Sequence, residues 1–352
     1  MNPIWFLRPL LSPAIKKFYN IKVVGKVPAP PYLLIANHTH FFDPFFIHSV
    51  IEEPIYWVVA KGNFEHPVKG GLFKSLGFIP KQKGVPDFST IRNIYRNLKK
   101  GNIVGIFPEG SVTWDGNFQE VPKGTDKLLN MVKAKIVAVK IQGGYLTKPR
   151  WADYGRKGTV TLEFREFSGD EALDFINHNE WDWQGEQRVI FKGNNRAKGI
   201  ERIIWYCPEC GTFRSIVSLS NVAYCKRCGA KLFVDEFGYV ANKRIDHILS
   251  EQLNLLIDDF YELGIAIAIV REKRKARLLK KIRGVVKVTK SYLSIGHEVF
   301  ELSRIKGVTT FLKNVTEFIY DDRYVVRIFL KYDSLLLYYL LRRYADVFKY
   351  GG

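Results

Sequence analysis

The residues best suited to chemistry follow a short apolar run. Asn37-His38-Thr39-His40-Phe41-Phe42-Asp43 comes directly after Leu33–Ala36. A histidine can act as a general base because its pKa lies near neutrality, and a carboxylate can hold the useful tautomer and stabilise the imidazolium. His38 and Asp43 are therefore the candidate base and its partner. A second pair with this spacing, His48 and Glu53, shows that spacing alone does not identify a site.

A second candidate segment ends another apolar run. Ile103–Phe107 leads into Pro108, which stops a strand, and then into Glu109, Gly110 and Ser111. Glu109 would place a carboxylate at the strand end, and Gly110 would let a ligand or the backbone approach closely. Both segments would line the edge of a parallel sheet where α/β folds bind ligands. Taken alone, the segment also fits an ordinary exit turn.

Four motifs in order resemble the lysophosphatidic acid acyltransferase family over roughly residues 20–165. The pattern N-H-x4-D matches Asn37, His38 and Asp43, and G-x-I-P-x-x-R matches Gly77, Ile79 and Pro80, with Lys83 in place of arginine. F-P-E-G-[ST] matches Phe107–Ser111, and the D-G and K-G elements match Asp115-Gly116 and Lys123-Gly124. A V-P-V strand matches Val137-Ala138-Val139, with Ala138 in place of proline.

This resemblance implies an acyltransferase. It would move a fatty acyl group from a thioester of acyl carrier protein or coenzyme A to the free hydroxyl of a lysophospholipid, first of all 1-acyl-glycerol-3-phosphate. His38 would be the base and Asp43 its partner. The implied substrate-binding residues are Gly77, Lys83, Glu109, Gly110, Ser111 and Lys123.

Two departures from the family pattern concern the phosphate group of the acceptor. Lys83 and Val112 stand where the family has arginine. Arginine grips phosphate through two hydrogen bonds, whereas lysine acts as a point charge. A different lysolipid acceptor therefore stays open. Among the other histidines, we expect His40 to be structural, and His48 and His247 to lie on the surface or in the core.

The four cysteines form two C-x2-C pairs. They are Cys207 with Cys210 and Cys225 with Cys228, each pair followed by glycine. This arrangement is typical of a structural zinc ion held by four thiolates. Disulfides or a redox site are the alternatives, although disulfides need an oxidising compartment and the chain shows no export signal.

The elements that position these residues predict an α/β fold with a largely parallel sheet. Strand-length runs alternate with helical segments such as Ser89–Lys99, and a further strand is expected over Gly158–Phe167. The expected strands are Tyr32–Ala36, Ile55–Ala60, Ile103–Phe107 and Ile136–Ile141. We expect a glycerolipid-acyltransferase-like sheet with flanking helices, then a small zinc ribbon and a β-rich C-terminal domain. The expected domain ranges are 1–200, 205–235, 243–283 for a basic helical linker, and 284–352.

The last part of the chain resembles a small pleckstrin-homology-like or GRAM-like domain. Strands are expected at Val285–Thr289, Tyr292–Ile295 and Arg323–Leu330, and a closing helix at Ser334–Val347. Before them, a helix is expected from Lys243 to Arg283. The last thirteen residues of that range include eight lysines and arginines, which suit docking to anionic lipid or form the solvated face of a helix.

The net charge suits a polyanionic partner such as nucleic acid, an anionic membrane or a phosphorylated substrate, and a basic surface without such a partner is the alternative. The 352 residues include 54 lysines and arginines against 35 aspartates and glutamates, a formal charge of +19. No apolar stretch reaches the roughly 18–20 residues of a spanning helix. Residues 2–19 form an aromatic-rich amphipathic stretch that would lie on a membrane or pack on the core. We expect a cytoplasmic protein bound peripherally to the anionic cytoplasmic face of a membrane, with no nucleic-acid partner. A zinc-ribbon adaptor that binds nucleic acid or protein on an inactive acyltransferase scaffold is the alternative.

Overall fold

The computed structural model describes residues 8–65, 67–81, 88–273 and 277–344, and the chain divides into two compact units. Unit 1 comprises residues 1–149, 155–193 and 236–238, and unit 2 comprises residues 150–154, 194–235 and 239–352. The finer division into four domains stays a prediction. No helix among the described residues is both long and apolar enough to cross a membrane.

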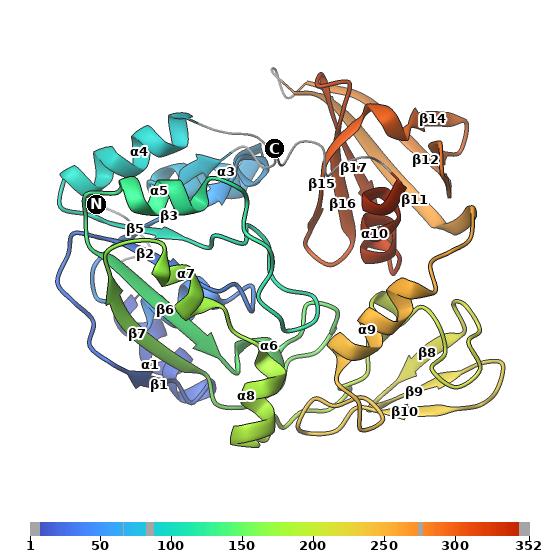
Figure 1. The fold of residues 1–352 in the computed structure, drawn as a ribbon, viewed down its shortest axis with the longest axis horizontal. Helices are drawn as coiled ribbons and strands as arrows, with labels where there is room; N and C mark the ends of the chain where they lie inside the picture. Colours follow the sequence, from blue (N-terminus) through green and yellow to red (C-terminus); the bar gives the residue numbers. More distant parts are fainter. Residues whose placement is uncertain (1–7, 66, 82–87, 274–276, 345–352) are drawn as a thin grey trace. The chain divides into compact units, whose positions relative to one another are not determined.

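Unit 1 is built on one mixed sheet in the order β1-β7-β6-β2-β5-β3-β4, which confirms the expected α/β class (Figure 1). All neighbouring strands are parallel except β6 and β7, which are antiparallel. The strands are β1 (Lys22–Val24), β2 (Tyr32–Ala36), β3 (Ile55–Ala60), β4 (Ile79–Lys81), β5 (Ile103–Ile106), β6 (Ile136–Gln142) and β7 (Thr161–Phe167). The helices are α1 (Arg8–Phe18), α2 (Asp43–His48), α3 (Pro67–Ser75), α4 (Phe88–Lys99), α5 (Thr125–Met131), α6 (Gly144–Thr147), α7 (Glu171–Ile176) and α8 (Glu180–Gln187), with a 3₁₀ helix at Lys61–Glu65.

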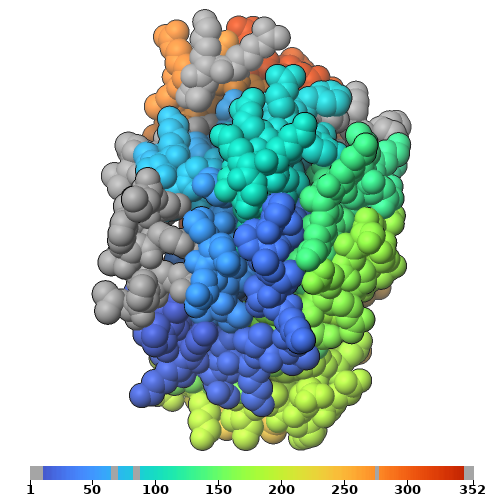
Figure 2. All heavy atoms as spheres, turned by 90° about the vertical axis from the view of Figure 1, so that its left-hand side faces the viewer, coloured from blue at the N-terminus to red at the C-terminus, as the bar shows by residue number. Residues whose placement is uncertain are grey.

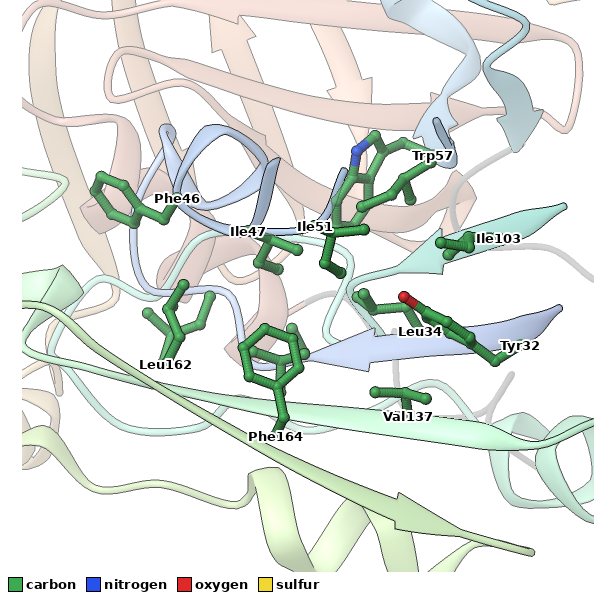
Figure 3. Close-up of a cluster of buried hydrophobic side chains, with 14 of the residues drawn as sticks. Tyr32, Leu34, Phe46, Ile47, Ile51, Trp57, Ile103, Val137, Leu162 and Phe164 are labelled. Carbon is green, nitrogen blue, oxygen red and sulfur yellow. The ribbon is translucent and has the colours of Figure 1, made fainter. Parts of the chain in front are cut away.

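Both faces of this sheet are covered. All five residues of β2 are buried, as expected for a central strand of a largely parallel sheet. Tyr32, Leu34 and Ala36 point to the side of α2, and Figure 3 shows Tyr32 and Leu34 there with apolar residues of the neighbouring elements. Leu33 and Ile35 point to the side of α4, α5 and α7. In the side view of Figure 2, the α4 segment (cyan to teal) lies above the N-terminal segments (dark blue).

Unit 2 contains two antiparallel sheets. The smaller has the order β10-β9-β8 and carries the cysteines, and the larger has the order β14-β13-β12-β11-β17-β16-β15. The elements are a 3₁₀ helix at Ile200–Arg202, β8 (Ile216–Leu219), β9 (Val222–Cys225), β10 (Lys231–Phe233), α9 (Ile245–Asn254), β11 (Phe260–Glu272), β12 (Leu278–Thr289), β13 (Tyr292–Ile295), β14 (Glu298–Glu301), a 3₁₀ helix at Leu302–Arg304, β15 (Ile305–Phe311), β16 (Val315–Tyr320), β17 (Tyr324–Phe329) and α10 (Ser334–Tyr344). This β-rich region with its closing helix is the architecture that the sequence predicted.

The prediction of one helix from Lys243 to Arg283 is wrong beyond Asn254. Among the described residues of this range only α9 is helical, and β11 and β12 pair as long antiparallel strands. The larger sheet therefore begins at Phe260 rather than at residue 284, and residues 260–272 and 278–283 of the expected basic linker belong to its strands. The basic residues 274 and 275 lie outside the described residues.

The small cysteine-bearing sheet is joined to the rest of unit 2 by polar contacts. The Gln252 side chain on α9 accepts hydrogen bonds from the backbone N–H groups of Trp205 and Tyr206, at 2.5 and 2.9 Å. Arg214 donates to the carboxylate of Asp333 at 2.8 Å, and the same carboxylate oxygen accepts the N–H of Gly264 at 3.0 Å. These contacts tie the segment around the cysteines to both α9 and β11.

Candidate active site

Two motifs that are distant in sequence meet because their strands are neighbours. β2 and β5 pair in parallel from Tyr32 with Ile103 to Ile35 with Ile106. Their carboxyl ends therefore lie at the same edge of the sheet, where Asn37 follows β2 and Phe107 follows β5. The structure thus brings the first and third motifs together.

The carboxylate of Asp43 organises the first motif. It is fully buried and accepts four hydrogen bonds. Oδ2 accepts from Nδ1 of His38 at 2.9 Å and from the backbone N–H groups of Thr39 at 2.7 Å and His40 at 2.8 Å. Oδ1 accepts from the Thr39 hydroxyl at 2.9 Å. Because Oδ2 acts as an acceptor, Nδ1 of His38 carries the ring proton and Nε2 keeps its lone pair.

The His38 ring is held on one face by aromatic stacking. It lies 4.1 Å from the Phe107 ring, centre to centre, at an interplanar angle of 17°. Phe107 in turn stacks on Trp57 at 4.8 Å and 5°. The His38 side chain stays 18% exposed, so a substrate can reach it from solvent. Its tautomer, orientation and partial exposure suit a general base.

The backbone of His38 is held on both sides by the segment after β5. Its N–H donates to Oε1 of Glu109 at 2.5 Å, and its carbonyl oxygen accepts the N–H of Thr113 at 2.9 Å. The other oxygen of Glu109, Oε2, accepts the N–H of Gln119 at 2.8 Å. Both oxygens of this buried carboxylate therefore bind the backbone of the site. Burial raises the pKa of Glu109 well above its ordinary value.

Asn37 connects the first motif to the other neighbour of β2. Its amide donates to the carbonyl oxygen of Ile141 at 2.8 Å, and its amide oxygen accepts the N–H of Ile141 at 2.7 Å. The buried side chain thus continues the pairing with β6 beyond the end of β2. The chain that carries His38 is consequently tied to both neighbouring strands.

His40 has the environment of a structural residue. Its ring is buried and stacks on Phe42 and Phe46, with centroids at 5.6 Å in each case. Nδ1 accepts the backbone N–H of Phe42 at 3.1 Å. Burial lowers the pKa of His40 to about 4, so the ring is neutral at physiological pH.

For the other residues expected to bind substrate, the structure gives a position in the fold but no role. Gly110 and Ser111 directly follow Glu109, and Gly110 is exposed with φ +69°. Lys123 is exposed just before α5. Gly77 precedes the edge strand β4, three positions from β2, or roughly 14 Å at normal strand spacing. Lys83 lies outside the described residues.

A backbone requirement accounts for Gly77. It has φ +71°, and a Cβ atom there would lie 2.7 Å from the Tyr56 ring. Both features exclude a larger side chain without local rearrangement. The substrate-binding role of Gly77 stays a prediction.

Sequence reasoning missed the residues that hold His38 through backbone groups. Thr113 and Gln119 contribute their N–H groups, and every residue except proline has this group, so their residue types carry no signal. Thr39 contributes both its hydroxyl and its N–H to Asp43. A hydroxyl residue inside the N-H-x4-D motif was the available signal for it.

The four cysteines form a separate cluster in unit 2. The sulfur atoms of Cys207 and Cys228 and those of Cys210 and Cys225 are each 3.7 Å apart, and all four lie within 4.8 Å of one another. A disulfide needs about 2.05 Å. The residues after the pairs, Gly211 and Gly229, have φ +66° and +76° and donate their N–H groups to the carbonyl oxygens of Cys207 and Cys225. The cluster could hold one metal ion.

We expect Glu109→Gln to destabilise the protein in a pH-dependent way. Glutamine can accept with only one of its two terminal atoms, which leaves one buried N–H group unpaired at a cost of about 1–3 kcal/mol. Because the folded state raises the pKa of Glu109, the stability due to this group is present below its unfolded pKa of about 4.3 and is lost as pH rises through the folded pKa. The deficit of the variant should therefore be larger at pH 4–5 than at pH 8.

Urea unfolding of the parent and Glu109→Gln across this pH range would measure the deficit. Glu120→Gln is the matched control, because Glu120 lies nearby but is exposed. An equal deficit at every pH would contradict the assignment of a raised pKa.

The first comparison with known proteins concerns the segment that carries the site. Residues 20–142 match the family model described as Acyltransferase. A chloroplastic 1-acyl-sn-glycerol-3-phosphate acyltransferase of Arabidopsis thaliana is 25% identical over 138 residues, which cover 38% of this chain and 38% of that protein. The 1-acyl-sn-glycerol-3-phosphate acyltransferase of Bacillus subtilis is 27% identical over 129 residues, which cover 35% of this chain and 63% of that protein. The chain thus spans only part of the length of these curated relatives.

Two further similarities are more distant. The lyso-ornithine lipid O-acyltransferase of Pseudomonas aeruginosa is 23% identical over 161 residues, covering 46% of this chain and 56% of that protein. The crystal structure of the 1-acyl-sn-glycerophosphate acyltransferase from Thermotoga maritima aligns with a TM-score of 0.40 at 18% identity, over 51% of this chain and 81% of that one. The family-model match, the two glycerophosphate relatives and the motif order agree that residues 20–142 are similar to acyltransferases of the lysophosphatidic acid acyltransferase family.

Proposed function

We propose that this protein transfers a fatty acyl group from a thioester to the free hydroxyl of a lysophospholipid, most simply 1-acyl-glycerol-3-phosphate. One observation carries the proposal. The buried carboxylate of Asp43 holds His38 in the tautomer of a general base, inside a segment that matches the acyltransferase family. Its relatives include enzymes named for 1-acyl-sn-glycerol-3-phosphate. The similarity to a lyso-ornithine lipid O-acyltransferase makes other lysolipids candidate acceptors as well.

The mechanism needs one base and no acyl-enzyme. Nε2 of His38 accepts the proton of the acceptor hydroxyl while that oxygen attacks the carbonyl carbon of the thioester. A C–O bond forms, the tetrahedral intermediate collapses, and the C–S bond breaks. The thiolate leaves and takes the proton from the imidazolium of His38. Asp43 stabilises the imidazolium between these two proton transfers.

The acceptor is proposed to meet the protein beside Glu109. Both oxygens of Glu109 are used by backbone N–H groups, which supports a role in shaping the site rather than in gripping glycerol. Gly110 and Ser111 follow it toward solvent and are better placed to contact the acceptor. Lys83 and Lys123 are proposed to attract the phosphate group as point charges.

A peripheral position on a membrane is supported by exposed aromatic residues beside the site. Phe41, Phe42 and Phe45 are 64%, 39% and 39% exposed within and just after the first motif. They belong to a chain of contacting rings that continues through His40, Phe46 and Tyr19 to Phe18 on α1, which is 50% exposed. Lys16 and Lys17 are exposed on the same helix. Apolar rings with nearby lysines suit an anionic cytoplasmic membrane face.

The cysteine cluster is proposed to hold one structural zinc ion. In a tetrahedral site with Zn–S bonds of about 2.3 Å, the sulfur atoms lie about 3.8 Å apart, close to the two distances of 3.7 Å. Bound zinc would stabilise the turns that carry Cys207 to Cys228, where the chain is too short to bury a core of its own. Four thiolates would leave the zinc no open coordination position, so the acyl transfer is assigned no step at the metal.

The activity is tested by an acyl-transfer assay of the purified chain over a panel of lysolipids with both donor types, acyl carrier protein and coenzyme A. We expect transfer to 1-acyl-glycerol-3-phosphate. His38→Ala should lower turnover roughly 100- to 10,000-fold, the range for general-base catalysis, and Asp43→Asn should also lower it strongly. His247→Ala is the matched control, because His247 is exposed in unit 2. Turnover of His38→Ala close to that of the parent would refute the mechanism.

Membrane contact is tested with vesicles that contain phosphatidylglycerol. Replacing both Phe41 and Phe45 by serine should weaken binding at least tenfold, because each fully buried phenylalanine contributes about 1.5–3 kcal/mol. Phe88→Ser is the control, since Phe88 is 79% exposed on α4, on the other side of the sheet. Sedimentation of protein with vesicles gives the partition coefficients. Equal losses in the control and the double variant would argue against this contact.

The zinc proposal is tested by elemental analysis of protein purified without chelator, which should contain one zinc ion per chain. Cys225→Ser should lose the zinc and become sensitive to protease near residues 205–235. Tyr224→Phe should keep both, because Tyr224 is the exposed neighbour of the buried Cys225. Zinc-free protein, or a Cys207–Cys228 disulfide in the native chain, would overturn the assignment.

A further inference from the structure

A segment beyond the family match packs against the loop that holds His38. His178, Glu180 and Trp181 lead into and begin α8, and their exposed fractions are 7%, 0% and 2%. The family match ends at residue 142. Nothing in the motif pattern therefore assigns these buried residues a role.

This segment pairs with the loop at residues 113–119, which we call the support loop. The N–H of Phe118 donates to the carbonyl oxygen of His178, and the N–H of Glu180 donates to that of Gly116, both at 3.0 Å. Between them, Asn117 and Asn179 form an antiparallel bridge. The support loop is thus one side of a short backbone ladder whose other side is the entry to α8.

Side chains reinforce this ladder. The indole Nε1 of Trp181 donates to the carbonyl oxygen of Asp115 at 2.6 Å. A Cβ atom on Gly116, which has φ +93°, would lie 3.0 Å from that indole nitrogen and 3.2 Å from Cβ of Glu180. The support loop is therefore in van der Waals contact with Trp181 and Glu180 as well as hydrogen-bonded to them.

The entry to α8 is itself rigidly held. One oxygen of Glu180 lies 2.9 Å from Nε2 of His178, and the other accepts the N–H of Leu146 at 3.4 Å. The Asn179 side chain caps the helix by accepting the N–H groups of Trp181 at 2.8 Å and Asp182 at 3.1 Å. A fixed element of this kind can hold a loop in one position.

The support loop contacts the catalytic segment on its other side. The N–H of Thr113 binds the carbonyl oxygen of His38 at 2.9 Å, and the N–H of Gln119 binds Glu109 at 2.8 Å. Glu109 in turn accepts the N–H of His38 at 2.5 Å. Both hydrogen bonds that hold the His38 backbone thus depend on where the support loop lies.

We propose that Trp181 and Glu180 are positioning residues for the general base. They hold the support loop so that Thr113 and Glu109 keep the backbone of His38 in place. The inference rests on the proposed acyl transfer. A base must lie about 2.6–3.2 Å from the proton that it removes, and a displacement of about 1 Å can cost 100-fold in rate. Loosening the support loop should therefore lower the rate of the chemical step more than it weakens substrate binding.

Trp181→Phe is the test variant, because it removes the indole donor and keeps an aromatic ring. We expect kcat to fall about 5- to 20-fold while KM for the acceptor and for the donor stays within twofold. Trp183→Phe is the matched control on the same helix, where Trp183 is only half-buried, and it should keep kcat within twofold. Glu180→Gln should retain more activity than Glu180→Ala, because glutamine can still accept the N–H of Leu146.

Hydrogen exchange separates this inference from the proposed function. Peptides that cover residues 37–43 and 113–119 should exchange faster in Trp181→Phe than in the parent, whereas Trp183→Phe should leave both unchanged. If the parent transfers no acyl group to any acceptor, the proposed function fails, and exchange alone decides on the support loop. Unchanged exchange in both peptides, or an active parent with an unchanged kcat in Trp181→Phe, would overturn the inference.

Discussion

The buried carboxylate of Asp43 is the interaction on which the site depends. A carboxylate without water is costly unless its oxygens are satisfied, and here they accept four hydrogen bonds from three successive residues, His38, Thr39 and His40. Meeting this requirement constrains the arrangement of the segment after β2. That arrangement sets the tautomer of His38, buries His40 and turns the next phenylalanines toward solvent. The same carboxylate that organises the fold of the segment therefore sets the tautomer of its histidine.

A second buried carboxylate performs a similar task on the backbone. Glu109 uses both oxygens on the N–H groups of His38 and Gln119. Since it belongs to the motif after β5, it connects the ends of two neighbouring strands across the edge of the sheet. Asn37 makes the corresponding connection to β6. His38 is thus held by groups from both neighbours of β2, which explains how a residue in a short segment between a strand and a helix is kept in one position.

The error in the expected helix over residues 243–283 has an identifiable physical cause. In β11, Ala266 and Ala268 are buried, while Ile265 and Ile267 are 64% and 38% exposed. The small alanines face the core and the large isoleucines face solvent. Both faces of the strand are therefore apolar, and its sequence is a continuous apolar run rather than an alternation of apolar and polar residues. Such a run does not distinguish a helix from a strand. Pairing with β12 and β17 satisfies the backbone on both sides and decides the outcome.

The sequence by itself determined the parts of this protein whose chemistry resides in side chains. Strands β2, β3, β5 and β6 follow from residue types at short spacings. The pairing of His38 with Asp43 and the clustering of the four cysteines follow in the same way. Only the tertiary structure decided which residues hold the site through their backbone groups. Thr113, Gln119 and Gly116 hold the site with N–H and carbonyl groups that almost every residue possesses, and Trp181 meets Asp115 from 66 residues away. The backbone contacts leave no pattern in the sequence, because they do not depend on residue type, and the Trp181 indole meets Asp115 only because the fold brings the two segments together.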